Sequence, residues 1–369
     1  MVDTGPSVSK ENIWRMLATN PQTRWSLKGE SDQDAQTRLS RGFVIPEVEP
    51  SFTIPMDLPI FTIGSCFARN IEDALAAEGA QLPTKSIVMK FAAERGLRPN
   101  SILNKYNIPS IVQELSWALT EDGFKGDYLI EGGKHYVDPH LDDQAPDASP
   151  AELLDRHEQV THVFRALAGV KTIVMTLGMT EAWYDTKYNL ALNTSPSMGA
   201  INTEPGRFEF RIMSYEENRV HLESCIDLIF SHAAPDARMI LTVSPVALNL
   251  TFRKRDVIVA NSQSKATLVA LGQATANAHP HVDYFPSYEA VTGSDPLFAW
   301  QPDRRHASPR MVELLVSEFL HRYAGHPKPD WPNFQDDRIG QIIDDLHRNT
   351  KKLELMVNWS QALSKKQKI

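Results

Sequence analysis

The sequence predicts an α/β protein with a mostly parallel, doubly wound sheet. Of its 369 residues, 42% are hydrophobic and 23% charged, which is ordinary for a folded domain and excludes a disordered or fibrous chain. From Pro59 onward, short apolar runs alternate with longer helical patterns, as in βαβ units. The predicted strands are almost entirely apolar, which is typical of strands buried on both faces: 60–63, 86–89, 172–177, 239–243 and 282–285.

Helix starts between these strands are marked by capping residues. Ser149 precedes a proline and is followed three residues later by a glutamate. Ser214 stands three residues before Glu217, and Ser308 again precedes a proline. Each of these serines therefore predicts the start of an amphipathic helix.

The rest of the chain divides into three parts. Residues 1–54 are predicted to be an N-terminal arm or cap, because a polar stretch and a run of prolines separate them from the first strand. Residues 55–327 form the α/β domain, with an inserted hairpin at about 127–149. Residues 328–369 carry an apolar helical stripe and a basic end, so we expect a helical tail that packs on the domain, on a second copy in a homo-oligomer, or on neither.

Charge and composition narrow the possible partners. There are 38 Lys and Arg against 46 Asp and Glu, a net charge of −8, which argues against nucleic acid as a partner. No apolar stretch is long enough to span a membrane and the start of the chain has no signal-peptide pattern, so we expect a cytoplasmic protein without a membrane partner. The two cysteines are too few for a disulfide framework and lack zinc spacing, and we expect no metal.

A candidate nucleophile follows the first predicted strand. The strand stops at Gly64-Ser65 and a helix pattern begins at once. Ligands bind at the carboxyl ends of parallel strands, and the free N–H groups of a helix start favour developing negative charge. The position at the strand end and the electrostatic field of the helix start therefore suit Ser65 as a nucleophile. The plainer alternative is an ordinary helix cap. Cys66 is a rival nucleophile, although it fits better as a small buried apolar group.

A serine nucleophile needs a base, because its hydroxyl reacts poorly until the proton is removed. Asp303 and His306 lie three residues apart in the predicted loop after the last strand, so the carboxylate could hold one ring nitrogen while the other faces Ser65. A second Asp-x-x-His pair, Asp344 and His347, falls on the polar face of the predicted tail helix. Context therefore favours Asp303 and His306 as the orienting carboxylate and the base.

Other polar residues are expected at the same edge of the sheet. Gly178 and Thr180 follow the strand 172–177, and the amides of Asn104 and Asn107 are of a kind used as oxyanion donors. The plainer alternatives are a tight turn at the glycine and local hydrogen bonds for the asparagines. The set predicted for the oxyanion hole or for substrate binding is Cys66, Asn104, Asn107, Gly178, Thr180, Glu181 and Tyr288.

The string GSCFA at residues 64–68 carries a family resemblance. The chain resembles the GSCFA-domain family over roughly residues 55–325. Further matches follow in the family's order at 176–183, 242–246, 260–265, 284–289 and the Asp303/His306 segment.

The GSCFA family looks like a branch of the SGNH (GDSL-like) hydrolases. This resemblance implies a flavodoxin-like three-layer sandwich and an esterase, lipase or carbohydrate O-acetyl esterase or transferase activity. It also implies that Ser65 is the nucleophile and that Asp303 and His306 complete a triad. Where many SGNH members have Gly-x-Asn-Asp, this chain has Gly-Met-Thr-Glu at 178–181, so the oxyanion-binding asparagine is absent there.

Together these features predict a serine-dependent acyl-ester hydrolase or O-acyltransferase acting on a small or carbohydrate O-acyl ester. A transferase could use acyl-CoA as donor, and no other cofactor is expected. Candidates for a positive patch that would hold such a donor are Arg253, Arg255, Arg304 and Arg305. The alternative is a non-catalytic module that binds an anion or a glycan at the Gly64-Ser65 turn.

Overall fold

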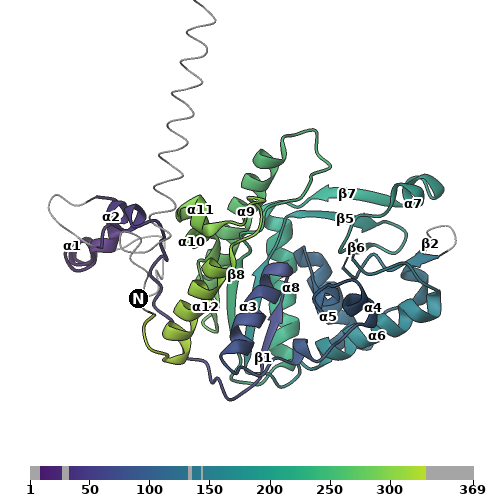
Figure 1. The fold of residues 1–369 in the computed structure, drawn as a ribbon, viewed down its shortest axis with the longest axis horizontal. Coiled ribbons are helices and arrows are strands. Elements are labelled where there is room, and N and C mark those ends of the chain that lie inside the picture. The colour runs from purple at the N-terminus through teal and green to yellow at the C-terminus, as the bar shows by residue number, and fades with distance from the viewer. Residues whose placement is uncertain (1–8, 27–32, 132–134, 143, 330–369) are drawn as a thin grey trace, which may run out of the picture.

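The computed structural model describes residues 9–26, 33–131, 135–142 and 144–329 (Figure 1). Predictions for residues 330–369, including the tail helix and the Asp344/His347 pair, lie outside the described residues. Within the described ranges, no helix has both the length and the apolar composition needed to cross a bilayer.

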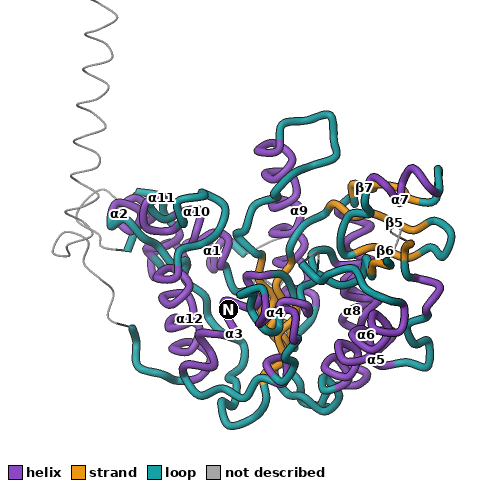
Figure 2. Tube along the Cα trace, turned by 45° about the vertical axis from the view of Figure 1, so that its right-hand side comes forward, coloured by secondary structure: helices purple, strands orange, loops and turns teal. Residues whose placement is uncertain are grey.

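Four parallel strands form the central sheet, which lies between layers of helices (Figure 2). Their spatial order is β1-β4-β8-β9. They are β1 (Ile60–Ile63), β4 (Thr172–Leu177), β8 (Arg238–Val243) and β9 (Val282–Tyr284). Every residue of β1 and β4 is buried, because helices cover both faces of the sheet. The α/β fold with a parallel, doubly wound sheet is therefore confirmed.

The register of the sheet brings the strand ends together. Thr172 of β4 lies opposite both Ile60 of β1 and Arg238 of β8, so the three strands begin level. Because β1 ends at Ile63, the residues that follow it lie beside the last residues of β4. The carboxyl ends of these strands thus form one edge.

One face of the sheet is covered by four long helices. They are α5 (Ile108–Leu119), α6 (Pro150–Arg165), α8 (Tyr215–His232) and α9 (Val257–Ala278). Their apolar side chains pack with those of the strands in the larger of two core clusters that flank the sheet. This is the first outer layer of the sandwich (Figure 1).

The opposite face is covered by α3 (Cys66–Ala77), α10 (Ser287–Gly293), α11 (Pro296–Ala299) and α12 (Pro309–Ala324). Residues 43–54 run along this layer, and their apolar side chains join its core. Backbone hydrogen bonds such as that from Ile54 N to Tyr323 O fix the segment there. The last part of the predicted arm is therefore packed against the domain.

The predicted capping serines start helices as expected. Ser149 and Ser308 accept hydrogen bonds from backbone N–H groups in the first turns of α6 and α12. Ser214 forms a complete capping box with Glu217 at the start of α8. These local signals were sufficient because the cap and its donor lie within three residues of each other.

The predicted hairpin is present as β2 (Ile130–Glu131) and β3 (Tyr136–Val137), which pair antiparallel. The predicted strand at 86–89 is wrong: this segment is a loop whose residues Ile87 and Met89 are buried against the helices. The remaining helices are α1 (Lys10–Thr19), α2 (Ala35–Ser40), α4 (Lys90–Glu94), η1 (Pro21–Thr23), η2 (Pro83–Lys85), η3 (Ser101–Leu103) and η4 (Gly126–Tyr128).

A second small sheet follows β4 and was not predicted. It consists of β5 (Glu181–Asp185), β6 (Leu190–Leu192) and β7 (Phe208–Ile212), with β5 in the middle and both pairings antiparallel. The short helix α7 (Met198–Thr203) lies between β6 and β7 in the chain. Because β5 begins four residues after β4 ends, this sheet stands beyond the carboxyl edge of the central one (Figure 1).

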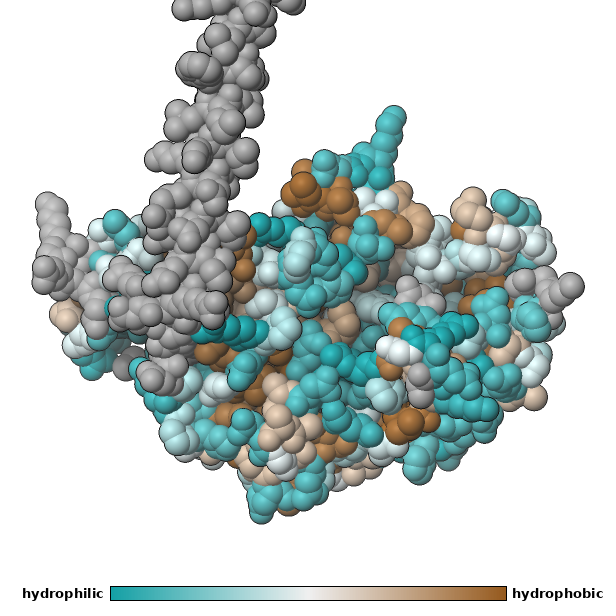
Figure 3. All heavy atoms as spheres, in the orientation of Figure 1, coloured by the Kyte–Doolittle hydropathy of each residue, from teal (hydrophilic) through white to brown (hydrophobic). Residues whose placement is uncertain are grey.

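Apolar side chains are exposed over the start of α9 (Figure 3). They belong to the loop before the helix and to its first turn: Leu250, Phe252, Ile258 and Val259. The Phe252 ring also contacts Trp183 and Phe210 of the small sheet, with centroids 5.0 and 5.3 Å away. The small sheet and the start of α9 therefore form one continuous structure above the strand ends.

Candidate active site

The turn between β1 and α3 can accommodate only glycine at position 64. Gly64 has a φ of +136°, which side-chain-bearing residues rarely adopt, and a Cβ atom there would lie 2.0 Å from Thr176 Oγ1. The backbone at Gly64 packs closely against β4, and the chain then enters the first turn of α3 at once. Ser65 and Cys66 are thereby held at the carboxyl edge of the sheet.

Replacing Gly64 with alanine should destabilise the protein by about 2–3 kcal/mol, from backbone strain and the clash with Thr176. The matched control is Gly79→Ala, because Gly79 also has a positive φ, of +85°, but a Cβ there meets nothing within 4 Å. Urea unfolding of both variants measures the difference. Equal losses at the two positions would contradict the close contact.

Ser65 is the N-cap residue of α3, yet its side chain makes no capping hydrogen bond. The side chain is buried, and its Oγ lies 3.5 Å from Ser244 Oγ, just beyond the end of β8. The recorded contact of this hydroxyl is therefore with Ser244 rather than with an imidazole. The first backbone N–H groups of α3, which a cap would otherwise bind, face the same edge.

Asp303 and His306 meet in the loop between α11 and α12. Asp303 Oδ2 lies 2.6 Å from His306 Nδ1, and Asp303 Oδ1 accepts hydrogen bonds from the backbone N–H groups of Arg305 and His306 at 3.0 Å. The hydrogen bond with the His306 side chain, followed by these backbone bonds, holds the pKa of Asp303 far below its usual value. Asp303 is therefore a carboxylate that fixes the imidazole, as the i, i+3 spacing predicted.

The other side of the His306 imidazole faces Cys66. The largest influence on the pKa of His306 is a side-chain hydrogen bond with Cys66, and Nδ1 is already engaged by Asp303. The bond with Cys66, aided by the one to Asp303, raises the pKa of His306 above 6.5 even though burial opposes it. Arg305 Nη1 lies 3.3 Å from Nε2, and since a guanidinium can only donate, Nε2 is the acceptor of the pair.

A buried lysine lies close to the same thiol. Lys265 of α9 is almost fully buried and its Nζ donates to the Gly178 carbonyl at 2.7 Å. Burial lowers the pKa of Lys265 to about 7, while the nearby Cys66 has the opposite, smaller effect. The site therefore brings together one thiol, one imidazole and one amine from three different elements. From the sequence, Ser264 and Lys265 are candidates for substrate binding, the plainer alternative being a helix cap and a solvated amine, and the Lys265 amine is buried rather than solvated.

Several residues predicted for the oxyanion hole are engaged in structural contacts. Gly178 lies at the end of β4, where a Cβ would come within 2.4 Å of the Tyr106 carbonyl oxygen, so the glycine is needed for this close approach. The Thr180 backbone N–H donates to Ser264 Oγ at 2.9 Å and is thus already occupied. Asn104 donates to Asp142 at 2.9 Å, inside a buried network.

Three further predicted residues have structural partners. Asn107 caps α5, its Oδ1 accepting from Ser110 N at 2.9 Å, and its amide donates to the Leu192 carbonyl. Glu181 is buried in an ion pair with Arg253, 2.7 Å away. Tyr288, on α10, packs against the larger core. Cys66 is half-buried and packs against the smaller core cluster, so the buried apolar group that the sequence favoured is found in part.

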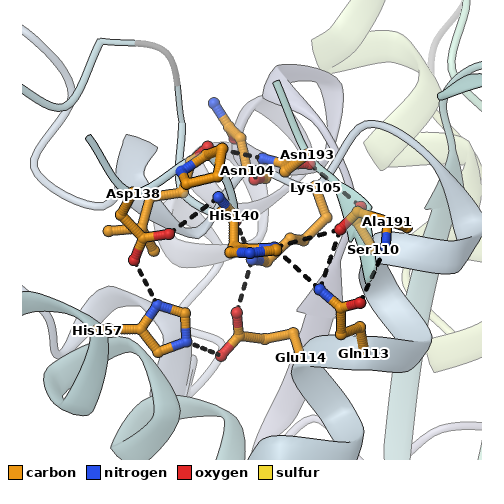
Figure 4. A network of polar contacts seen from close by, with 12 residues as sticks. Asn104, Lys105, Ser110, Gln113, Glu114, Asp138, His140, His157, Ala191 and Asn193 are labelled. Atoms are coloured by element: carbon orange, nitrogen blue, oxygen red, sulfur yellow. Dashed lines mark hydrogen bonds and ion pairs between the residues drawn. The ribbon is translucent and has the colours of Figure 1, made fainter. Parts of the chain in front are cut away.

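A buried polar network supports the loop beside the site (Figure 4). Lys105 donates to Glu114 at 2.7 Å and to the His140 carbonyl at 2.6 Å. His157 bridges Asp138, 2.6 Å from Nδ1, and Glu114, 3.7 Å from Nε2. Burial lowers the pKa of His140 to about 4, which keeps this imidazole neutral.

The network is continuous with the strand edge. The Lys105 backbone N–H donates to the Gly64 carbonyl at 2.9 Å, and the Met179 N–H donates to the Tyr106 carbonyl at 2.9 Å. The loop thus bonds to the chain after both β1 and β4. Among the described residues, no group of three or more His, Cys, Asp or Glu side chains is arranged to hold a metal ion.

Comparisons with known proteins give one family. A search of the curated proteins found no match. Among solved structures, a Clostridium thermocellum family 3 carbohydrate esterase is similar at 12% identity, over 72% of this chain and 94% of that one, with a TM-score of 0.30. The model of the GSCFA family matches residues 59–319, and the chain therefore belongs to the GSCFA family.

Proposed function

We propose that this protein is an acyl-transfer enzyme, an ester hydrolase or O-acyltransferase, whose general base is His306. The observation that carries the proposal is the 2.6 Å contact between Asp303 Oδ2 and His306 Nδ1, on an imidazole whose other nitrogen faces the start of α3. Acyl transfer requires a carboxylate that contacts an imidazole, and a nucleophile that contacts the same imidazole.

Each part has a defined task in this reaction. His306 Nε2 takes a proton from the nucleophile in the first turn of α3 and returns it to the leaving group. Asp303 keeps the Nδ1 proton in place and stabilises the imidazolium that forms. The uncapped N–H groups of α3 are donors for the negative charge on the carbonyl oxygen. The nucleophile is Ser65 or Cys66, which are adjacent at this position.

The substrate class follows from the family resemblance, which implies a small or carbohydrate O-acyl ester. Hydrolase and transferase differ only in whether water or a sugar hydroxyl receives the acyl group. Arg305 lies next to His306 and is positioned to meet an anionic part of a substrate or an acyl-CoA donor. Arg253 is less suited to this role because Glu181 neutralises it.

The pH dependence of ester turnover tests the role of His306. The groups that face His306 are Cys66 and Asp303, which raise its pKa, and Arg305, which lowers it, and the net pKa lies above 6.5. A protonated imidazole cannot accept a proton, so kcat/KM for p-nitrophenyl acetate should fall about tenfold per pH unit below that pKa. Circular dichroism over the same pH range serves as the control for folding.

A kcat/KM that stays constant between about pH 5 and 8 would contradict the assignment of the base. If the folded protein hydrolyses no p-nitrophenyl ester but binds inorganic phosphate in calorimetry, the anion-binding module replaces the enzyme. Such a module would use the α3 N-terminus without any proton transfer.

A further inference from the structure

We propose that the nucleophile of this site is the thiol of Cys66 and not the hydroxyl of Ser65. This inference rests on the proposed acyl-transfer function, and it changes the covalent intermediate from an oxygen ester to a thioester. Three observations support it: the contact of the Ser65 hydroxyl with Ser244, the contact between Cys66 and His306, and the basic groups near the thiol.

The Ser65 hydroxyl is buried beside a second serine. Ser65 is only 4% exposed, and its Oγ contacts Ser244 Oγ at 3.5 Å, at the end of β8. To act as the nucleophile, this oxygen would have to pass its proton to His306, and among the described residues no hydrogen bond joins the two side chains.

The Cys66 side chain already meets the base. Cys66 is the first residue of α3, it is half-buried rather than enclosed, and its side chain hydrogen-bonds to His306. The base is in turn held by Asp303 at 2.6 Å. Nucleophile, base and orienting carboxylate are thus connected in one chain of contacts, which is the arrangement expected of an activated nucleophile.

Two basic side chains lie near the Cys66 thiol. A thiol is activated beside cationic groups or at a helix N-terminus. Both features occur here, because His306 and the buried Lys265 lie close to a side chain in the first turn of α3.

The reaction balances without any further reagent. The Cys66 proton passes to His306 Nε2, Sγ bonds to the ester carbonyl carbon, and the carbon–oxygen bond to the leaving group breaks. The leaving alkoxide takes the proton from His306, and a thioester remains on Cys66. His306 then removes a proton from water or an acceptor hydroxyl, whose oxygen bonds to the same carbon, and the carbon–sulfur bond breaks. The sulfur recovers the proton from His306 and the thiol is restored.

Turnover of p-nitrophenyl acetate by matched variants tests the assignment. Cys66→Ala should reduce kcat/KM by about 10⁴-fold or more, whereas Ser65→Ala should change it by less than about tenfold. Cys66→Ser keeps the size of the side chain and guards against a folding defect, and it should also lose most of the activity. If Ser65→Ala abolishes turnover and Cys66→Ala retains it, the inference is overturned while the proposed function stands.

Alkylation by iodoacetamide gives a second readout that needs no ester. Cys66 should react faster than Cys225, which is fully buried and whose thiol pKa burial raises strongly. His306→Ala should slow alkylation of Cys66 by about tenfold or more, because the base no longer assists formation of the thiolate. Equal rates in wild type and His306→Ala would overturn the inference. If His306→Ala retains both the ester turnover and the alkylation rate of the wild type, the proposed function is overturned as well.

Discussion

Replacing His306 with alanine should lower kcat/KM for ester turnover by about 10²–10⁴-fold, which corresponds to about 2.7–5.5 kcal/mol. The imidazole is the only group in the described part of the site that contacts both Asp303 and Cys66, so its removal leaves the nucleophile without a base. Steady-state hydrolysis of p-nitrophenyl acetate measures the loss. Asp303→Asn should weaken turnover in the same direction, because an amide does not stabilise the imidazolium.

Folding should be nearly unaffected by these changes. The side chains of His306 and Asp303 are 31% and 47% exposed, and an exposed ion pair contributes about 0–1 kcal/mol. His279→Ala is the matched control, because His279 also pairs with a carboxylate, Glu223, at 2.9 Å but lies away from the strand edge. A similar loss of turnover in His279→Ala would show that the effect is not specific to the site.

Replacing Lys105 with methionine should destabilise the protein by about 3–5 kcal/mol. The change removes the amine that lies 2.7 Å from Glu114, and both side chains are almost completely buried. The Glu114 carboxylate would then be left without its cationic partner in a dry environment, which is costly. Urea unfolding followed by circular dichroism measures the free energy of unfolding.

Lys171→Met is the control for this variant. Lys171 pairs with Asp236 at the same 2.7 Å, but the two side chains are 41% and 60% exposed, so the expected loss is about 0–1 kcal/mol. Equal losses in the two variants would contradict a structural role for the buried network. Because the Lys105 side chain also ties the loop beside Gly64 to Glu114 and to the His140 carbonyl, its replacement should reduce ester turnover in the remaining folded protein.

The central sheet could be predicted from sequence because its strands are short, apolar and separated by well-capped helices. The mistaken strand at 86–89 has the same apolar character, yet its side chains Ile87 and Met89 fill a helical layer. Apolar composition reports burial, and it cannot by itself distinguish a strand from a buried loop. The segment at 208–212, Phe-Glu-Phe-Arg-Ile, alternates polar and apolar residues, and this signal could have revealed β7.

In the candidate site, too, contacts between residues close in sequence could be predicted, whereas contacts between distant residues could not. The contact between Asp303 and His306 follows from their spacing of three residues, so it could be predicted. The contact between Cys66 and His306 joins residues far apart in the chain, and only the folded sheet edge brings them together. Asn107 was predicted as an oxyanion donor, although the proline two residues later is also the signal of the helix cap that it forms.

The central claim is that the first turn of α3 becomes acylated with His306 as the base. Mass spectrometry of the protein, quenched with acid within the first turnover of p-nitrophenyl acetate, tests it most directly. The account predicts a single acetyl group within residues 64–66 of the wild-type protein, and its loss in His306→Ala. An acetyl group located elsewhere, or equally abundant in His306→Ala, would contradict the account.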